Sequence, residues 1–584
     1  MHQKGFLEEA EKLYLKILEA DPNNPNANYF LGLIARQTDR NERAVPLFIK
    51  AIEGNSNEPA YHADLGSVLH RLGRLEDAVA GYQNALVLKP DFPEVLSNKG
   101  VALKELGRLE EAVACFRSAL EINQDFVKAH INLGNALLKM LRREEAEACY
   151  RTALAINPDF LDAHLGLGKA LRKQGRQDEA LVSYQHAVAL MPNSPEAHNS
   201  LGTVFKELGR IEDAVESYQQ ALSLNPDFAD VHSNLGVASL EMGQLDDAEA
   251  WQLKALEIDA DCAEAHYILG LLHLMAGRFR EGWDAYHWRW RLDEYSNKPE
   301  IPVSEWDGSD IANKTILIWA EQGVGDEILF AGILPDLIAT GARVILESDP
   351  RLVPLYQRSF PGIECIAKGE LPASGLRYED IDFQAPVGDL GGWFRPDIAS
   401  FSTPCGFLKA DPERTAQLRA RYRERFPDKH LVGISWRSIS MHTGGGRSLA
   451  LEDWLPVLSH PRCAFVNLQY GDVADELNGL RRDHGIDVLV DPDIDPFGDI
   501  DGLSSQIAAM DSVISIDNIT LLLAGSLGVS TWALLMTPPD WRWLLDRDDS
   551  PWYPEMRLFR QEKTKDWTGV IDRMARALNG RFEN

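Results

Sequence analysis

The chain has little cysteine and a shortage of positive charge. Only six of its 584 residues are cysteine, and no two of them have the spacing of a metal site or a redox pair. So few cysteines in so long a chain argue against a disulfide framework and indicate a reducing compartment. Lysine and arginine number 59 against 89 acidic residues. Nonspecific nucleic-acid binding needs basic residues facing phosphates, so we expect no nucleic-acid partner and interpret the negative charge as aiding solubility.

Long hydrophobic runs are also scarce. No apolar signal core follows residues 1–5, so we expect a cytoplasmic protein. Residues 519–536 form one uncharged run long enough for a membrane span, but its glycine and hydroxyl residues favour a helix followed by a buried strand. We therefore predict no membrane span. The length and an ordinary composition, 45% hydrophobic and 25% charged, indicate a globular protein with more than one domain.

Glycine recurs at a fixed interval in the first half. Eight glycines, from Gly32 to Gly270, are each 34 residues apart, and alanines follow the first seven of them by 12 and by 19 positions. Small residues at a fixed phase let two helices cross closely, and one helix pair cannot bury its apolar face alone, so the units should stack. This pattern resembles the tetratricopeptide repeat, and the match is very specific. It predicts an α-solenoid over residues 1–294.

Three asparagines lie two positions before a repeat glycine: Asn98, Asn132 and Asn234. At this phase they should point into the concave groove of the solenoid. Protein O-GlcNAc transferases carry an asparagine ladder in a similar groove, where it holds peptide backbone, so the resemblance implies acceptor binding. The alternative is that asparagine is common repeat consensus here and the array is a plain scaffold.

The last repeat departs from the pattern. Residues 282–290 are crowded with aromatic side chains, and Gly282 replaces the expected alanine. We interpret this segment as a cap that docks the array on the domain after it. Prolines and an Asp-Gly pair then mark residues 295–313 as a linker.

Apolar runs alternate with helix-like segments in the second half. This βα pattern predicts two facing lobes, residues 314–428 and residues 429–584, the second with a terminal helix. Three runs of the second lobe stop abruptly at Arg437, at Gln469-Tyr470 and at Asp517-Asn518. Ligands bind at the carboxyl ends of parallel strands, so these residues should form the floor of a ligand site.

The first strand of the first lobe opens into a glycine-containing turn, Glu321-Gln322-Gly323-Val324-Gly325-Asp326. Asp326 should lie at or near the start of a helix. It is either a helix N-cap, which aspartate fills well, or a carboxylate facing a cleft. Gly-x-Gly alone is weak, and the dinucleotide-binding fingerprint is not completed.

Together these motifs resemble those of a GT-B glycosyltransferase. The second half is similar to the heptosyltransferase-like domains that follow tetratricopeptide arrays in bacteria. Flagellin-modifying transferases and O-GlcNAc transferases, enzymes of protein glycosylation, share this layout of repeats plus GT-B. The motifs that carry the resemblance are the Glu321–Asp326 turn, Arg447-Ser448-Leu449, residues 468–472, Asp517-Asn518 with residues 523–528, and residues 540–543, 550–554 and 557–561.

The resemblance implies a role for each motif. Asp326 would be the general base on an acceptor hydroxyl. Arginine pairs well with phosphate, and a helix amino terminus favours a diphosphate, so the second lobe would hold the nucleotide-sugar. The predicted donor-binding residues are Arg437, Arg447, Ser448, Gln469, Tyr470, Asp517, Asn518 and Gly525, and the predicted acceptor-binding residues are Glu321 and Gln322 with Asn98, Asn132 and Asn234.

The predicted activity is inverting, metal-independent transfer of a sugar from a nucleotide-sugar to a protein hydroxyl, with the array selecting the protein. We expect no cofactor and no metal, because the Asp-x-Asp spacings at 491–493 and 499–501 are better explained as turn formers. The oligomeric state stays open. The alternative is a repeat scaffold whose inactive GT-B domain binds a partner or nucleotide. Its best support is Leu522, where related sequences commonly have histidine.

Overall fold

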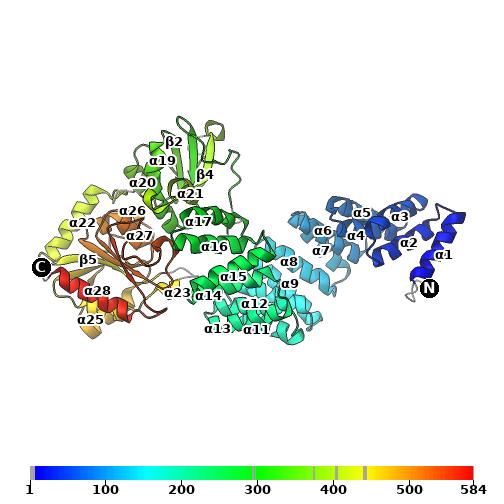
Figure 1. The fold of residues 1–584 in the computed structure, drawn as a ribbon, viewed down its shortest axis with the longest axis horizontal. Coiled ribbons are helices and arrows are strands. Elements are labelled where there is room, and N and C mark those ends of the chain that lie inside the picture. The colour runs from blue at the N-terminus through cyan, green and yellow to red at the C-terminus, as the bar shows by residue number, and fades with distance from the viewer. Residues whose placement is uncertain are drawn as a thin grey trace. The chain divides into compact units, whose positions relative to one another are not determined.

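The computed structural model describes residues 7–292, 295, 298–371, 375, 377–401, 406–438 and 444–582. It divides into two compact units, Met1–Pro226 and Asp227–Asn584, which are described separately (Figure 1). This division by packing falls inside the repeats. The boundaries predicted at residues 294, 313 and 428 stay predictions.

The first unit is a stack of paired helices. From α2 onward, helices of 13 and 14 residues alternate, and proline begins α2, α4, α6 and α12, where its missing N–H costs nothing. The described helices of this unit are α1 Leu7–Ala20, α2 Pro25–Gln37, α3 Asn41–Gly54, α4 Pro59–Arg71, α5 Leu75–Leu88, α6 Pro93–Glu105, α7 Leu109–Ile122, α8 Val127–Lys139, α9 Arg143–Ile156, α10 Leu161–Lys173, α11 Gln177–Leu190, α12 Pro195–Glu207 and α13 Ile211–Leu224.

The repeat glycines make room for an aromatic ring. A β-carbon built on Gly100 would lie 2.6 Å from the ring of Phe116, and one on Gly134 would lie 2.7 Å from the ring of Tyr150. Each ring lies 16 positions after its glycine and is fully buried. The 34-residue period therefore places one ring in each of these helix pairs, in the close packing that the sequence predicted.

A left-handed residue turns the chain between the helices of each repeat. Glycine fills this position in most repeats, as at Gly107, where φ is 77°. At Leu141 the same position is held by an exposed leucine with φ of 60°. A residue with a β-carbon is strained there, since its side chain crowds the following carbonyl.

The second unit begins with repeat helices and continues into two parallel sheets. Its described elements are α14 Ala229–Glu241, α15 Leu245–Ile258, α16 Ala263–Met275, α17 Phe279–Tyr286, η2 His287–Arg291, β1 Thr315–Trp319, α18 Val324–Phe330, η4 Ala331–Ile333, α19 Leu334–Ala339, β2 Arg343–Ser348, α20 Val353–Ser359, β3 Glu364–Ala367, η5 Tyr378–Asp380, β4 Phe383–Pro386, η6 Val387–Asp389, α21 Leu390–Phe394, η7 Ile398–Ser400, α22 Pro412–Arg425, β5 His430–Ser435, α23 Gly444–Arg447, η8 Leu451–Trp454, α24 Leu455–Leu458, β6 Cys463–Asn467, α25 Ala474–His484, β7 Val488–Leu489, α26 Ile500–Ala508, β8 Ser512–Ile516, α27 Ile519–Ser526, β9 Thr531–Leu535, η9 Trp541–Trp543, β10 Met556–Arg560 and α28 Thr568–Arg581.

All strand pairs in both sheets are parallel. The first sheet has the order β3-β2-β1-β4, and the second has the order β10-β9-β8-β5-β6-β7. Helices cover both faces of the second sheet, with α25 and α28 on one side and α26 and α27 on the other (Figure 1). The fold is thus a helical solenoid followed by an α/β domain, as predicted.

The uncharged run at 519–536 divides as the sequence predicted. Residues 519–526 are helix α27, and residues 531–535 are strand β9, whose side chains are all buried. Within the described part of the chain, no helix has the length and apolar character of a membrane span.

A buried ion pair joins the last repeat to the first sheet. The guanidinium of Arg289 donates to both carboxylate oxygens of Glu321, at 2.6 and 2.8 Å, and to Asp389 at 2.7 Å. Nearby, the indole N–H of Trp283 donates to the carbonyl of Arg395, and the Trp283 ring covers Gly391. The prediction that residues 282–290 form a docking cap is therefore confirmed.

Candidate active site

The polar residues that end β5, β6 and β8 lie together at the carboxyl edge of the second sheet. The side-chain oxygen of Gln469 accepts hydrogen bonds from the backbone N–H groups of Trp436 and Arg437, each at 2.9 Å. Asn518 caps α27 and donates to Ser435 at 2.8 Å. Gln469 and Asn518 are buried, so their side chains hold the strand ends in place and present the neighbouring residues to the edge.

The other predicted donor residues take different positions around this edge. Arg437 donates to the carbonyl of Asp472 and pairs with Glu476 at 3.5 Å. The hydroxyl of Ser448 accepts from the backbone N–H of Ser438 at 3.0 Å. Gly525 packs against Tyr553, whose ring would lie 2.8 Å from a β-carbon built there. Gly525 thus has a packing role in α27, away from the strand ends.

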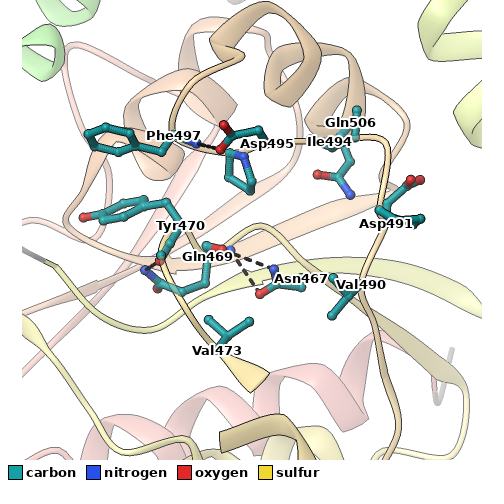
Figure 2. Close-up of a pocket in the computed structure, with 13 residues that line it drawn as sticks. Asn467, Gln469, Tyr470, Val473, Val490, Asp491, Ile494, Asp495, Phe497 and Gln506 are labelled. Carbon is teal, nitrogen blue, oxygen red and sulfur yellow. Dashed lines mark hydrogen bonds between the residues drawn. The ribbon is translucent and has the colours of Figure 1, made fainter. Parts of the chain in front are cut away.

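A cavity of about 630 Å³ opens beside the ends of β6 and β7 (Figure 2). Its walls are mostly aliphatic and aromatic, and the rings of Tyr470 and Phe497 lie 6.4 Å apart between centroids with their planes tilted by 51°. The amide of Gln506 turns toward this space (Figure 2). Gln506 is 1% exposed, and its side-chain oxygen has no hydrogen-bond partner among the described residues. A buried acceptor without a partner is costly, so this oxygen is the candidate at the cavity for pairing with an N–H donor.

A row of alternating charges links the turn after β1 to the segments that follow β5, β8 and β9. Asp326 accepts from Arg542 at 3.2 Å, and Arg542 donates to Asp540 at 2.9 Å. Asp540 also accepts from Arg447 at 3.0 Å, and Arg447 lies 3.3 Å from the carboxylate of Asp517. All five side chains are at most 21% exposed. The predicted base and two predicted donor residues are therefore members of one ion-pair row.

The row holds three carboxylates against two guanidiniums, and burial acts on their protonation. Burial raises the pKa of Asp326 above its ordinary value, against the opposing attraction of Arg542. Burial would also raise the pKa of Asp540, but Arg542 and Arg447 outweigh it and lower that pKa to about 2. Of Asp326 and Asp540, Asp326 is thus the carboxylate better suited to accept a proton.

Aromatic residues from the last repeat and from η9 contact one another beside the turn that carries Asp326. Trp541 makes an edge-on contact with Trp283 at 5.5 Å, and Tyr286 accepts a hydrogen bond from Gln322 at 2.6 Å. Gln322 is exposed and has φ of 56°, a strained backbone for a non-glycine residue. Strain of this kind is often found at functional sites. The acceptor-binding role of Gln322 stays a prediction.

The remaining predicted acceptor residues are dispersed. Glu321 is 5% exposed and is engaged by Arg289, so the structure shows it in the docking ion pair. In the first unit, Asn98 on α6 is exposed and Asn132 on α8 is partly exposed. Asn234, on α14 of the second unit, is partly exposed. Their peptide-binding role stays a prediction.

Three functional candidates escaped the sequence reasoning. Arg542 and Asp540 lie within residues 540–543, which the sequence offered only as part of the resemblance, and the tryptophans beside them, Trp541 and Trp543, are buried. The signal available in the sequence was the spacing of Asp540 and Arg542, because a single turn can place both charged side chains on the same side. Gln506 lies inside a helix and gave no signal at all.

Comparisons with known proteins support the repeats. Tetratricopeptide repeat families match residues 3–59, 66–107, 100–140, 127–160, 168–209, 202–243 and 229–262. The first half is therefore a tetratricopeptide array. Protein FlbA of Caulobacter vibrioides is 33% identical over 317 residues, which are 52% of this chain and 52% of that protein. The chain thus spans about half the length of this curated relative.

Two solved tetratricopeptide proteins also resemble the chain. One, from Thermus thermophilus, is 24% identical with a TM-score of 0.28, covering 31% of this chain and 99% of that one. Another, from Parabacteroides merdae, is 18% identical with a TM-score of 0.38, covering 44% of this chain and 98% of that one.

Proposed function

We propose that the second half is a GT-B glycosyltransferase that moves a sugar from a nucleotide-sugar to a protein hydroxyl. The observation that carries this proposal is the ion-pair row. It brings Asp326, a carboxylate of the first sheet's lobe, next to Arg447 and Arg542 at the strand ends of the second. A base beside guanidiniums is what displacement of a diphosphate leaving group needs.

Asp326 acts as the general base in this proposal. Its carboxylate takes the proton of the acceptor hydroxyl, and the hydroxyl oxygen forms a bond to the anomeric carbon of the sugar. The bond between that carbon and the diphosphate breaks at the same time, which inverts the configuration. Arg447 and Arg542 meet the negative charge that develops on the leaving oxygen. The reaction needs no metal in this scheme.

The cavity orients the donor. Its apolar walls and the Tyr470–Phe497 ring pair suit a nucleobase, whose N–H group gives Gln506 the partner it lacks among the described residues. The carboxylates of Asp491 and Asp495 in its wall disfavour phosphate there. The cavity and Asp517 lie at opposite sides of β5, two strand spacings or roughly 10 Å apart, so a nucleotide reaches from one to the other.

The array presents the protein acceptor. Its last repeat contacts the turn that carries Asp326 through Tyr286 and Gln322, so a peptide leaving the array meets the base. Binding of the acceptor backbone by Asn98, Asn132 and Asn234 remains part of the proposal.

One observation favours the alternative of an inactive, nucleotide-binding scaffold. Leu522 is 2% exposed, and its side chain lies 3.2 Å from a β-carbon built on Gly325. Leu522 therefore places an aliphatic side chain against the turn that carries the proposed base. Related sequences commonly have histidine at this position.

Nucleotide release from a panel of nucleotide-sugars separates the two functions. The transferase releases nucleotide and labels a protein acceptor, and the Asp326→Asn variant does neither. The scaffold binds nucleotide by calorimetry without turnover in either form. Turnover that survives in Asp326→Asn contradicts the proposed mechanism.

A further inference from the structure

Asp540 contacts both arginines of the ion-pair row. One of its oxygens accepts from Arg542 Nε at 2.9 Å, and the other accepts from Arg447 Nη2 at 3.0 Å. Among the described residues, Asp517 forms its ion pair with Arg447 alone, and Asp326 forms its own with Arg542 alone. Asp540 is therefore the carboxylate that holds the two guanidiniums together.

The contacts of Asp540 are those of an anion with two well-separated oxygens. A diphosphate has more oxygens and more charge than a carboxylate, and it pairs with two guanidiniums at once. Both arginines are already positioned and largely desolvated, at 15% exposure for Arg447 and 11% for Arg542. A site that is preorganised around one anion costs little to reorganise around another.

We infer that Asp540 is a placeholder for the diphosphate of the donor, and that the donor binds by displacing Asp540 from Arg447 and Arg542. This rests on the proposed function and extends it, because it adds Arg542 to the diphosphate site and makes Asp540 a competitor for it. Displacement also moves Arg542 toward the leaving group. Asp326 then exchanges its arginine partner for the acceptor hydroxyl, so the base becomes available only when a donor is bound.

The negative charge of Asp540 predicts the direction in which anion affinity changes when Asp540 is replaced, and a purely structural role predicts the opposite direction. Three carboxylates and two guanidiniums leave the row net negative, so an entering anion is repelled until one carboxylate retreats. Removing the charge of Asp540 should therefore tighten anion binding, whereas removing a side chain that merely positions the arginines should weaken it. Asparagine keeps an oxygen that accepts from Arg542, so Asp540→Asn changes charge more than shape.

The test uses the full chain and inorganic pyrophosphate, with binding followed by calorimetry at low salt. Asp540→Asn should bind pyrophosphate about tenfold more tightly than the natural protein, by the loss of one like charge a few ångströms away. Asp540→Glu keeps the competing charge and should bind as the natural protein does. Arg542→Gln should bind at least tenfold more weakly, because a charged hydrogen bond is lost. Asp549→Asn, in the exposed pair with Arg547, is the matched control and should change nothing.

Unchanged or weaker pyrophosphate binding by Asp540→Asn overturns the inference, and so does full binding by Arg542→Gln. If Asp540→Asn melts below the assay temperature, the pyrophosphate affinities of Asp540→Glu and Arg542→Gln decide the question. Both variants keep a polar side chain that can hydrogen-bond at the substituted position. Sugar transfer is measured separately. If pyrophosphate affinity changes as predicted but no sugar is transferred, the role of Asp540 is supported and the transferase function is rejected. If sugar is transferred but pyrophosphate affinity does not change as predicted, only the role of Asp540 is rejected.

Discussion

The guanidinium of Arg289 is fully buried and binds both oxygens of the Glu321 carboxylate, at 2.6 and 2.8 Å. Arg289 belongs to the helix that ends the repeats, and Glu321 begins the turn that carries Asp326. The last repeat and the turn that carries Asp326 thus share one buried connection. In the proposed transferase, this connection would hold the last repeat in a fixed position beside the base.

Breaking this pair should destabilise the second unit. Glu321→Gln leaves Arg289 with Asp389 as its charged partner, and we expect a loss of about 1.5–3 kcal/mol, since the buried hydrogen bonds between Arg289 and residue 321 lose the charge of their acceptor. Thermal unfolding measures the change. Glu364→Gln is the control, because its pair with Arg343 is exposed at both ends and is worth less than about 1 kcal/mol. Equal melting temperatures for the two variants contradict the docking role.

Glu327 should make stability depend on pH. Burial raises the pKa of Glu327 to about 7, from 4.5 in the unfolded chain. Between these values the folded state binds more protons than the unfolded state, so stability falls as pH rises from about 4.5 to about 7 and is level above that. The cost at pH 8 is about 3 kcal/mol. Glu327→Gln should recover most of it at pH 8 and gain nothing at pH 4, as measured by urea unfolding.

The sequence predicted much of this fold because its signals are periodic or local. Gly100 and Gly134 marked the helix pairs through a 34-residue period, and Arg437 and Asp517 marked strand ends by abrupt polarity. Parallel strands then bring such ends together without further information. The parallel pairing of β5 with β6 and with β8 agrees with that reasoning.

The parts that the sequence did not predict depend on long-range packing. Asp326 and Arg542 are 216 positions apart, and no local pattern says that they pair. Glu321 is buried because Arg289 of the last repeat pairs with it. The sequence of the turn alone does not reveal this distant partner, so the Glu321 carboxylate was predicted to bind the acceptor. The side-chain oxygen of Gln506 has no partner among the described residues because of the packing around α26, which no local sequence pattern encodes.

Leu141 should be a point of strain in the array. Its φ of 60° lies at the turn position that glycine fills in most repeats, and its side chain is 67% exposed. Leu141→Gly relieves the backbone strain and loses little packing, so we expect a gain of about 1 kcal/mol. Leu141→Ala keeps a β-carbon and should gain almost nothing. A variant with glycine that melts no higher than the one with alanine contradicts this explanation.

Replacement of Asp326 by asparagine should separate chemistry from binding. The structure starts α18 at Val324 with Gly323 as its cap, so the N-cap role considered for Asp326 belongs to Gly323. Asparagine keeps the size of the side chain and an oxygen for Arg542, and the fold should persist. Loss of a general base typically lowers the rate about 10²–10⁴-fold.

The measurement pairs acceptor glycosylation with nucleotide affinity and melting temperature in the Asp326→Asn protein. We expect turnover to fall by that factor while the nucleotide still binds at least as tightly as in the natural protein, since the variant keeps both arginines and loses one negative charge beside Arg542. The pH profile adds a second readout. Burial raises the pKa of Asp326, so the acid limb of the natural protein's rate should lie above the range of an ordinary aspartate and should vanish in the variant. Full turnover with an unchanged acid limb assigns the base to another residue, and the first to examine is Glu327, the next carboxylate along α18.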